Sequence, residues 1–269
     1  MMEKLASVTL PTPHLRLKHC RQGVMLYDIR DEYTGKSLDR YGEFAEIEAE
    51  LFNDVIKPGM LVVEVGSNIG AQTLHLAKLV GDRGGVLAFE PDRVKFQMLS
   101  ANLALNGIEN TDTQCLAVGA EAGQARQSPS NDDGAEPDDA DDDVVDMVTL
   151  DNMMLPACHL IKINAEGIEK EVLEGARQTI ERFRPAIYTK DNKTENHVAL
   201  IATLLDLEYR IWWHLPHLFN PNNIAGETEN VFSEIPGFHL FCLPREQAPA
   251  EIPGGVEITN TFEPHPLLG

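Results

Sequence analysis

The sequence predicts an α/β fold in which helices cover both faces of a mostly parallel sheet. Three features of the chain lead to this prediction. Short apolar runs rich in valine alternate with stretches of helical periodicity. The first of these runs ends in a glycine-rich turn at residues 66–70, and a helical pattern follows the turn directly. The 269 residues, of which 43% are hydrophobic, are enough for one large domain with a core of its own.

Five predicted elements lie between residues 60 and 118. Residues 60–65 (MLVVEV) are too short for a buried helix and rich in valine, so they are predicted to form a strand. Residues 71–80 have helical spacing and stop at Gly81. The next predicted elements are a strand at 86–89, a helix at 92–106 and a strand at 113–118.

The same alternation resumes after residue 143. The predicted elements are strands at 144–150 and 159–163, a helix from 167 or 168 to 183, a strand at 185–189, a helix at 196–207, and strands at 209–214 and 238–243. Only a loop separates the last two strands, so they are expected to pair antiparallel at one edge of the sheet.

The chain is predicted to divide into three parts. Residues 1–50 form an N-terminal extension, a candidate lid, with a hairpin strand at 24–29 and the beginning of a helix at 44–55. Residues 51–245 form the main domain, and residues 246–269 form a C-terminal tail.

Acidic residues outnumber basic ones, 43 to 22, which gives a formal net charge of −21. Eight of these acids lie between Asp132 and Asp143, where there is no lysine or arginine. The stretch 121–143 is expected to be a flexible acidic insert, because it cannot bury enough apolar surface to offset its ordering entropy. Its aspartates lack the D-x-[DN]-x-[DN]-G spacing of a calcium loop.

Composition also argues against several classes of protein. The negative charge repels phosphate backbones and no basic patch is visible, so no nucleic-acid partner is expected. The four cysteines are widely spread, which favours neither a zinc site nor a disulfide framework and suits a reducing compartment. No run approaches the roughly 20 apolar residues of a membrane span. We therefore expect a cytoplasmic protein without a membrane span; the sequence leaves its oligomeric state open.

Two acids stand where a parallel sheet binds ligands, at the carboxyl ends of its strands. Glu64 precedes the first glycine of the turn by two residues, where it disfavours a pyrophosphate and favours an ammonium or sulfonium group. Glu90 ends the next predicted strand, where a carboxylate accepts the hydroxyl hydrogens of a ribose. Together they predict a nucleoside with a cationic tail, S-adenosylmethionine. The alternative is that both are solvated strand ends.

Three sequence blocks resemble the FkbM family of S-adenosylmethionine-dependent methyltransferases: VVEVGSNIG at 62–70, AFEP at 88–91 and IKINAEG at 161–167. The resemblance extends over about residues 38–245. It implies a Rossmann-like class I methyltransferase fold with a mostly parallel seven-stranded sheet and an antiparallel edge strand. It also implies methyl transfer, usually to a hydroxyl, on acceptors such as sugars of glycans or polyketide-type metabolites.

The resemblance assigns cofactor contacts to groups of residues along the chain. The methionine end would lie against Glu64, Gly66, Ser67, Asn68 and Gly70, the ribose against Glu90 with Pro91 and Asp92 beside it, and the adenine near Leu116 and Ala117. Tyr41 resembles a residue that closes over the methionine tail in many members; an ordinary packed aromatic is the equal alternative.

The chain departs from the family block D-L-I-K-I-D-x-E-G, because His159 and Asn164 replace its two acids. Asn164 lies just past a strand end, where the acceptor is expected. Loss of an acid there removes a base or metal ligand and leaves a hydrogen-bonding group. No metal is predicted, although Glu166 and Glu169 remain available as ligands.

Five side chains are candidates for binding the acceptor or removing its proton: Lys162, Asn164, Glu166, Asp191 and His214. Glu166 is the first choice, with a helix cap as its alternative role. Lys162 lies inside an apolar strand, so it is predicted to face the acceptor or a nearby carboxylate. His214 is a base or a hydrogen-bonded core histidine. Residues 217–229 form an acceptor rim or a plain surface loop.

Two other functions remain open on the sequence. An NAD-binding oxidoreductase shares this type of fold, but the glycines here are spaced G-x-x-x-G instead of G-x-G-x-x-G. A catalytically inactive S-adenosylmethionine-binding module is suggested by Asn164 and by the acidic insert.

Overall fold

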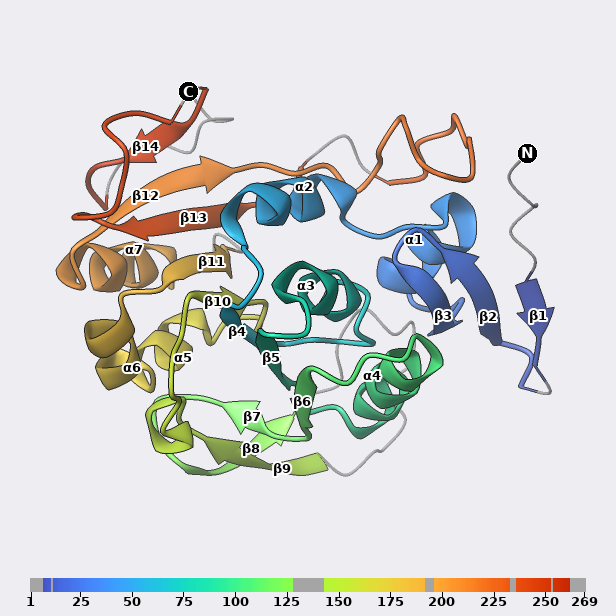
Figure 1. Ribbon diagram of the computed structural model, residues 1–269, viewed down its shortest axis with the longest axis horizontal. Coiled ribbons are helices and arrows are strands. Elements are labelled where there is room, and N and C mark those ends of the chain that lie inside the picture. Colours follow the sequence, from blue (N-terminus) through green and yellow to red (C-terminus); the bar gives the residue numbers. More distant parts are fainter. Residues whose placement is uncertain are drawn as a thin grey trace.

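The computed structural model describes residues 7–10, 12–127, 143–191, 196–232, 236–252 and 254–261. Its centre is a sheet of eight strands (Figure 1). In spatial order these are β14 (Val256–Ile258), β12 (Tyr209–His214), β13 (His239–Pro244), β11 (Ala186–Lys190), β10 (Leu160–Ile163), β4 (Leu61–Val65), β5 (Gly85–Phe89) and β6 (Thr111–Gln114).

The five strands from β11 to β6 are parallel, and β13 pairs antiparallel with both β11 and β12. This arrangement confirms the predicted α/β fold and the antiparallel pairing of β12 with β13. The pair does not form the edge, however. Residues of the predicted C-terminal tail form β14, which pairs antiparallel with β12 and buries Ile258. The edge strand was missed because three residues carry too short a pattern to stand out.

Helices cover both faces of the sheet because successive residues of its strands point to opposite sides. One face packs against α2 (Glu46–Val55), α3 (Thr73–Val80) and α4 (Arg93–Leu105). The other packs against α5 (Glu169–Glu174), α6 (Arg177–Phe183) and α7 (His197–Asp206). In β4, for example, Val62 belongs to the first core and Val63 to the second.

The helix predicted from 167 or 168 to 183 is two helices, α5 and α6, separated at Gly175. A Cβ at Gly175 would lie 2.0 Å from the carbonyl oxygen of Gly119. The close approach of these two backbone segments thus interrupts what the sequence pattern presents as one helix. Elsewhere the boundaries agree: Asp92 caps α4 by accepting from the amides of Val94 and Lys95.

The predicted strand at 113–118 is also divided, into β6 and β7 (Ala117–Val118). β7 belongs to a separate three-stranded sheet with β8 (Gly123–Gln127) and β9 (Asp143–Val148). The segment 121–143, predicted to be a loop, therefore begins with a strand, which its polar composition conceals. Residues 128–142 lie outside the described part of the chain.

The N-terminal extension forms a meander of β1 (Ser7–Thr9), β2 (Leu15–Cys20) and β3 (Gly23–Asp28), followed by α1 (Thr34–Tyr41). The predicted strand at 24–29 and helix at 44–55 are present as β3 and α2. Two α4 side chains, Asn102 and Asn106, bind the backbone of β3 and fix the meander beside the sheet (Figure 1). Among the described helices, none has the length and apolarity that crossing a bilayer requires.

Candidate functional site

The glycine turn lies at the carboxyl end of β4, over the end of β5. The amides of Gly66 and Ser67 both donate to the carbonyl oxygen of Phe89, at 2.9 and 3.0 Å. Gly66 has φ of 80°, and a Cβ there would lie 2.1 Å from the carbonyl oxygen of Asn164. Only glycine allows β4, β5 and the segment after β10 to approach so closely.

Two pockets border this turn. The smaller, of about 20 Å³, is lined by Thr34, Phe44, Glu64, Gly66, Ser67, Asn68, Ala71, Gln72, Lys162 and Asn164. The larger, of about 220 Å³, is lined by Asp28, Arg30, Asp31, Ile69, Asp92, Val94, Lys95 and Met98. The smaller pocket thus joins the turn to the end of β10, with α1 and the beginning of α2 above it.

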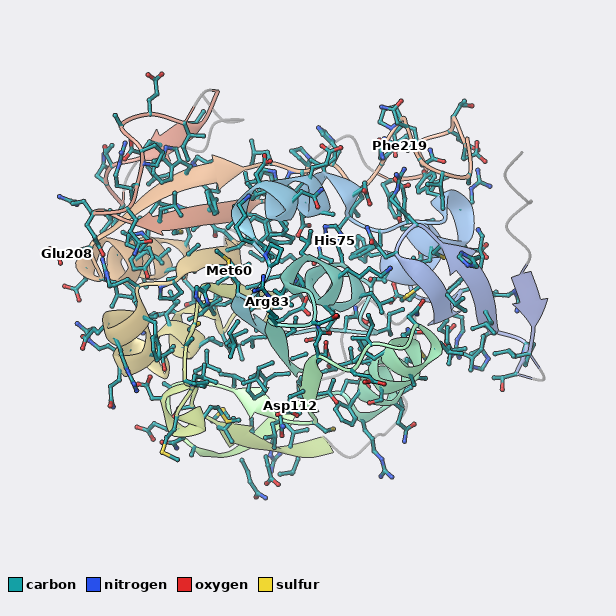
Figure 2. The ribbon with its side chains drawn as sticks, viewed as in Figure 1. Met60, His75, Arg83, Asp112, Glu208 and Phe219 are labelled. Atoms are coloured by element: carbon teal, nitrogen blue, oxygen red, sulfur yellow. The ribbon has the colours of Figure 1, made fainter. Side chains whose placement is uncertain are left out.

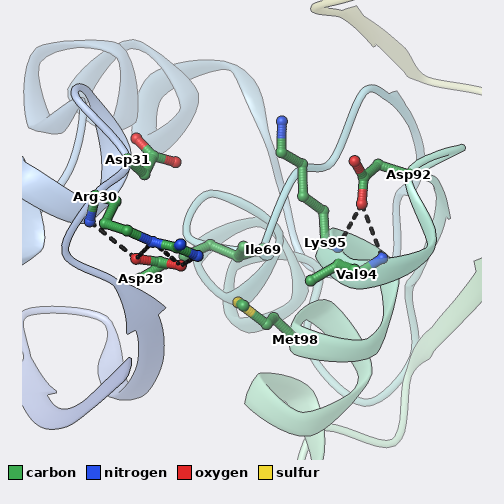
Figure 3. Close-up of a pocket in the computed structure, with 8 residues that line it drawn as sticks. All are labelled: Asp28, Arg30, Asp31, Ile69, Asp92, Val94, Lys95 and Met98. Carbon is green, nitrogen blue, oxygen red and sulfur yellow. Dashed lines mark hydrogen bonds and ion pairs between the residues drawn. The ribbon is translucent and has the colours of Figure 1, made fainter. Parts of the chain in front are cut away.

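The larger pocket lies between the end of β3 and the first turns of α4 (Figure 3). Its charged groups are largely engaged within the protein. Arg30 binds Asp28 through both carboxylate oxygens, and Asp92 caps α4. Ile69 forms its floor at the glycine turn, so the pocket is next to the turn but on the side facing the N-terminal meander.

Glu64 and Lys162 form a buried ion pair beneath the smaller pocket. The two residues are register partners on β4 and β10, and their side chains are 1% and 3% exposed. Lys162 Nζ lies 3.1 Å from Glu64 Oε1, and Thr73 Oγ1 donates to Glu64 Oε2 at 2.6 Å. The sequence predicted that Lys162 faces either the acceptor or a nearby carboxylate. Its contact with Glu64 confirms the second alternative.

A second buried carboxylate, Glu48, stands behind this pair at the beginning of α2. Gln72 Nε2 donates to its Oε2 at 3.0 Å, and His239 Nε2 lies 3.6 Å from its Oε1. Burial raises the pKa of Glu48, but the charges of His239 and Lys162 and the Gln72 hydrogen bond outweigh burial and hold this pKa below its usual value. Burial lowers the pKa of His239 to about 4, so its ring is neutral at pH 7.

The network continues through Tyr188 to His214. A hydrogen bond to Glu48 and burial hold the pKa of Tyr188 well above its usual value, so the phenol keeps its proton. Its oxygen lies 2.8 Å from His214 Nδ1, and its ring stacks on His239 at 5.1 Å. His214 is thus a hydrogen-bonded histidine at the end of β12, as one of its two predicted roles required.

Glu90 lies on the other side of the turn, at the end of β5, and is 5% exposed. Its Oε2 accepts from the amide of Asn68 at 2.7 Å, and its Oε1 accepts from the amide of Asp92 at 2.9 Å. Burial raises the pKa of Glu90 to about 7 despite these two bonds. Each carboxylate oxygen has a further lone pair, so Glu90 can accept two more hydrogen bonds.

The other residues assigned to the nucleoside lie beyond Glu90. Pro91 follows it, and the Cys115 thiol approaches the Pro91 carbonyl at 3.9 Å. Leu116 packs against the core and Ala117 is buried at the beginning of β7. Leu116 and Ala117 therefore follow β6 on the side of Glu90 away from the smaller pocket.

Of the remaining catalytic candidates, Asn164 is among the residues that line the smaller pocket, whereas Glu166 and Asp191 are not. Asn164 lines the pocket and is exposed. Glu166 is exposed and pairs with Lys190 at 2.7 Å, two residues before Ile168, the N-cap residue of α5. Asp191 is buried and binds His197 Nδ1 at 2.5 Å, at the beginning of α7.

Tyr41 is fully engaged by the segment 215–232. Its hydroxyl donates to the Glu229 carbonyl at 2.9 Å and accepts from the Val231 amide at 2.8 Å. Its ring packs against Phe219 at 5.3 Å, and Figure 2 places Phe219 next to α1. Tyr41 is 1% exposed, so its place in the structure is that of the packed aromatic, and it fixes the segment predicted to form an acceptor rim.

Glu43 supports the same contact between the extension and the segment 215–232. Its carboxylate accepts from Asn220 Nδ2 at 2.8 Å and from the Ile224 amide at 3.0 Å, and it pairs with Arg21 at 2.7 Å. The segment 215–232 therefore forms a wall held against α1 and the beginning of α2.

Six of the residues that the sequence singled out line one pocket: Glu64, Gly66, Ser67, Asn68, Lys162 and Asn164. It missed Glu48, Gln72, Thr73, Tyr188 and His239. One signal was available for Glu48: it lies four residues before Phe52 on the apolar stripe of α2, where a charged side chain must have a buried partner. In the described part of the chain, no three histidine, cysteine or acidic side chains are grouped as a metal site.

Comparison with known families decides the relationship suggested by the three sequence blocks. The model of the methyltransferase FkbM domain matches residues 64–211, more than half of the chain. The chain belongs to the FkbM methyltransferase family. The match begins at Glu64 and includes the glycine turn, Glu90 and Lys162. None of the curated proteins compared with the chain matches it significantly.

Solved structures of methyltransferases share the fold. A methyltransferase FkbM from Methylobacillus flagellatus is 18% identical, with a TM-score of 0.48 over 72% of this chain and 50% of the other, so the match spans half of that protein's length. A precorrin-6y C5,15-methyltransferase from Geobacter metallireducens is 11% identical, with a TM-score of 0.50 over 74% and 88% of the two chains. At 11% identity, the likeness to the precorrin-6y methyltransferase shows a shared fold alone.

Replacement of Lys162 by methionine should destabilise the protein strongly, because it leaves Glu64 buried without its cation. Breaking a buried pair in this way costs about 3–5 kcal/mol of unfolding free energy. Denaturant titration of Lys162→Met measures this loss. Lys170, a partly exposed lysine that pairs with Glu174 on α5, provides the control, and Lys170→Met should be indistinguishable from the parent. The double variant Glu64→Gln, Lys162→Met should recover part of the loss; a Lys162→Met variant as stable as the parent would contradict the ion-pair account.

Proposed function

We propose that the protein is an S-adenosylmethionine-dependent methyltransferase that methylates a hydroxyl of a sugar, a glycan or a small-molecule metabolite. The observation that carries the proposal is the position of two buried carboxylates, Glu64 and Glu90, on either side of the glycine turn. Glu64 borders the smaller pocket over β4 and β10. Glu90 ends β5 and can accept two more hydrogen bonds. Membership of the FkbM family supports methyl transfer as the reaction.

In this proposal the cofactor lies along the carboxyl ends of the strands. Glu64, Gly66, Ser67, Asn68 and Gly70 hold its methionine end, because they form the turn and the wall of the smaller pocket. Glu90 accepts hydrogen bonds from the ribose hydroxyls, with Pro91 beside it. Leu116 and Ala117 lie next to the adenine. Thr34 and Phe44, which line the smaller pocket, close over the methionine end in place of Tyr41.

The bound cofactor supplies a methyl group activated by its sulfonium. The protein then has to hold the acceptor oxygen in line with that methyl and exclude water. Asn164 lines the pocket at the end of β10, so we assign it to hydrogen bonding with the acceptor. Glu166, exposed beside Lys190, is assigned to removal of the acceptor's proton late in the step.

His214 and Asp191 receive supporting roles in the proposal. Three strands separate β12, which carries His214, from β4, and Tyr188 binds the Nδ1 atom of His214. We therefore assign His214 to the far end of a long acceptor. Asp191 binds His197 and is assigned to positioning α7. The segment 215–232 provides the rim above them. No metal is included in this proposal, and the net charge of −21 supports an acceptor other than nucleic acid.

One observation supports a second candidate function, that of a protein that binds S-adenosylmethionine without catalysing methyl transfer. Asn164 stands where an acid is usual in the family, so the acceptor end has an amide in place of a base. Such a protein would bind the cofactor at the same place and transfer no methyl group.

Calorimetric titration with S-adenosylmethionine and with NAD, followed by transfer of a labelled methyl group to a panel of sugars, glycans and hydroxylated metabolites, tests the proposal. We expect binding of S-adenosylmethionine alone and labelled product from at least one hydroxylated acceptor. Binding of NAD alone would refute the proposal. Cofactor binding with no product across the panel would favour the module without catalysis.

Cofactor affinity should depend on pH through Glu90. Because its pKa is raised to about 7, lowering the pH from 8 to 6 converts most of the carboxylate to an acid and removes an acceptor for the ribose hydroxyls. The dissociation constant should rise by up to about tenfold over this interval. Glu90→Gln should weaken binding and abolish the dependence. Glu169, whose pKa burial also raises to about 7, lies on α5 beyond the pocket lining, so Glu169→Gln should retain it. A dependence unchanged in Glu90→Gln would refute the assignment.

A further inference from the structure

The buried network beneath the smaller pocket contains more negative than positive charge. We define the buried charge cluster as Glu48, Glu64, Lys162 and His239, on α2, β4, β10 and β13. Lys162 contacts Glu64, His239 contacts Glu48, and the charge of Lys162 also acts on Glu48. Two of these four are carboxylates and one is an ammonium. His239 is neutral at pH 7, because burial lowers its pKa to about 4. The cluster therefore carries one uncompensated negative charge.

The residues around the cluster do not supply the missing cation. Lys190 acts electrostatically on His239 from the neighbouring strand, but its own charge is offset by Glu166, 2.7 Å away. Thr73, Gln72 and Tyr188 bind its carboxylates, and all three are neutral. Burial lowers the pKa of His214, the next group along the network, which keeps it neutral too. Within the described part of the chain, Lys162 and His239 are the basic groups in contact with these two carboxylates.

The uncompensated charge lies directly behind the wall of the smaller pocket. Glu64 and Lys162 line that pocket, and so does Gln72, whose amide donates to Glu48. Glu48 thus stands one side chain away from the pocket. It is 7% exposed, so the low-dielectric surroundings transmit its field to the pocket with little screening by water.

From this geometry we infer that Glu48 is a specificity-determining residue that makes the site prefer the charged sulfonium cofactor over its neutral, demethylated product. The inference rests on the proposed function. S-adenosylmethionine carries a sulfonium, an ammonium and a carboxylate, so its net charge is one positive. Transfer of the methyl group to the acceptor oxygen leaves a thioether on the cofactor, while the acceptor's proton passes to solvent. The product, S-adenosylhomocysteine, has no net charge.

The cluster and the cofactor are therefore complementary only before the reaction. Once the methyl group is transferred, the sulfonium charge is gone and the remaining ammonium and carboxylate of the product offset each other, so the attraction to the uncompensated carboxylate is weaker. Glu48 would in this way favour release of the product without touching it. Such an effect changes the ratio of the affinities for S-adenosylmethionine and S-adenosylhomocysteine. It leaves unchanged the contacts of the adenosine and amino acid groups that the two ligands share.

The test compares three ligands on Glu48→Gln and on Glu50→Gln, a matched variant at an exposed position of the same helix. The ligands are S-adenosylmethionine, S-adenosylhomocysteine and sinefungin, which carries an ammonium in place of the sulfonium. For unit charges about 10 Å apart at an effective dielectric constant of about 20–40, Glu48→Gln should weaken both cationic ligands by about five- to fifteenfold. Binding of S-adenosylhomocysteine should change less than about twofold. Glu50→Gln should match the parent for all three.

Each other outcome has a definite meaning. If Glu48→Gln weakens all three ligands equally, or none, Glu48 has a structural role or no role and the inference is overturned, while the proposed function stands. If the parent protein binds none of them, the proposed function itself fails. Thermal unfolding of both variants, with the glutamine amide still able to bond Gln72 and Tyr188, distinguishes a misfolded protein from a changed preference.

Discussion

The ion pair of Glu64 and Lys162 is the constraint on which the geometry of the site depends. Each side chain lies at the buried, next-to-last position of its strand, the two strands are neighbours in the sheet, and neither side chain would be tolerated there alone. Their contact fixes β4 against β10 in a register that brings Asn164 beneath Gly66. The absence of a Cβ at Gly66 then lets the turn settle over β5, where it meets Glu90. The pocket is a consequence of this arrangement.

A single pair would be electrically neutral, and a neutral site has no reason to prefer a cation. Glu64 was expected from the sequence to act as a free carboxylate, but Lys162 offsets its charge. Glu48, on α2, adds a second carboxylate, so the net charge of the site is negative. Gln72 and Tyr188 hold the Glu48 side chain by hydrogen bonds. The N-terminal extension thus contributes to the site in two ways. It provides a charge through α2, and through Glu43 and Tyr41 it holds the segment 215–232 as a wall.

Local sequence patterns predicted the strands, helices and turns that depend on neighbouring residues. They did not predict the features that depend on contacts between residues far apart in the chain. Valine-rich runs and helical spacing predicted the central strands β4, β5, β10, β11, β12 and β13 and the helices between them, because these elements are buried on both faces or on one stripe. The glycine turn and its two acids were visible for the same reason. The break at Gly175 depends on its approach to Gly119, and the burial of Tyr41 depends on residues nearly two hundred positions later. Neither contact leaves a periodic signal in the chain.

A crystal structure of the protein with S-adenosylhomocysteine tests the central claim most directly. The account predicts the ribose hydroxyls within hydrogen-bonding distance of both Glu90 carboxylate oxygens. It also predicts the amino acid end in the smaller pocket, against Glu64, Lys162 and the turn at Gly66. A ligand bound in the larger pocket between β3 and α4, with Glu90 and Glu64 uncontacted, would contradict the account.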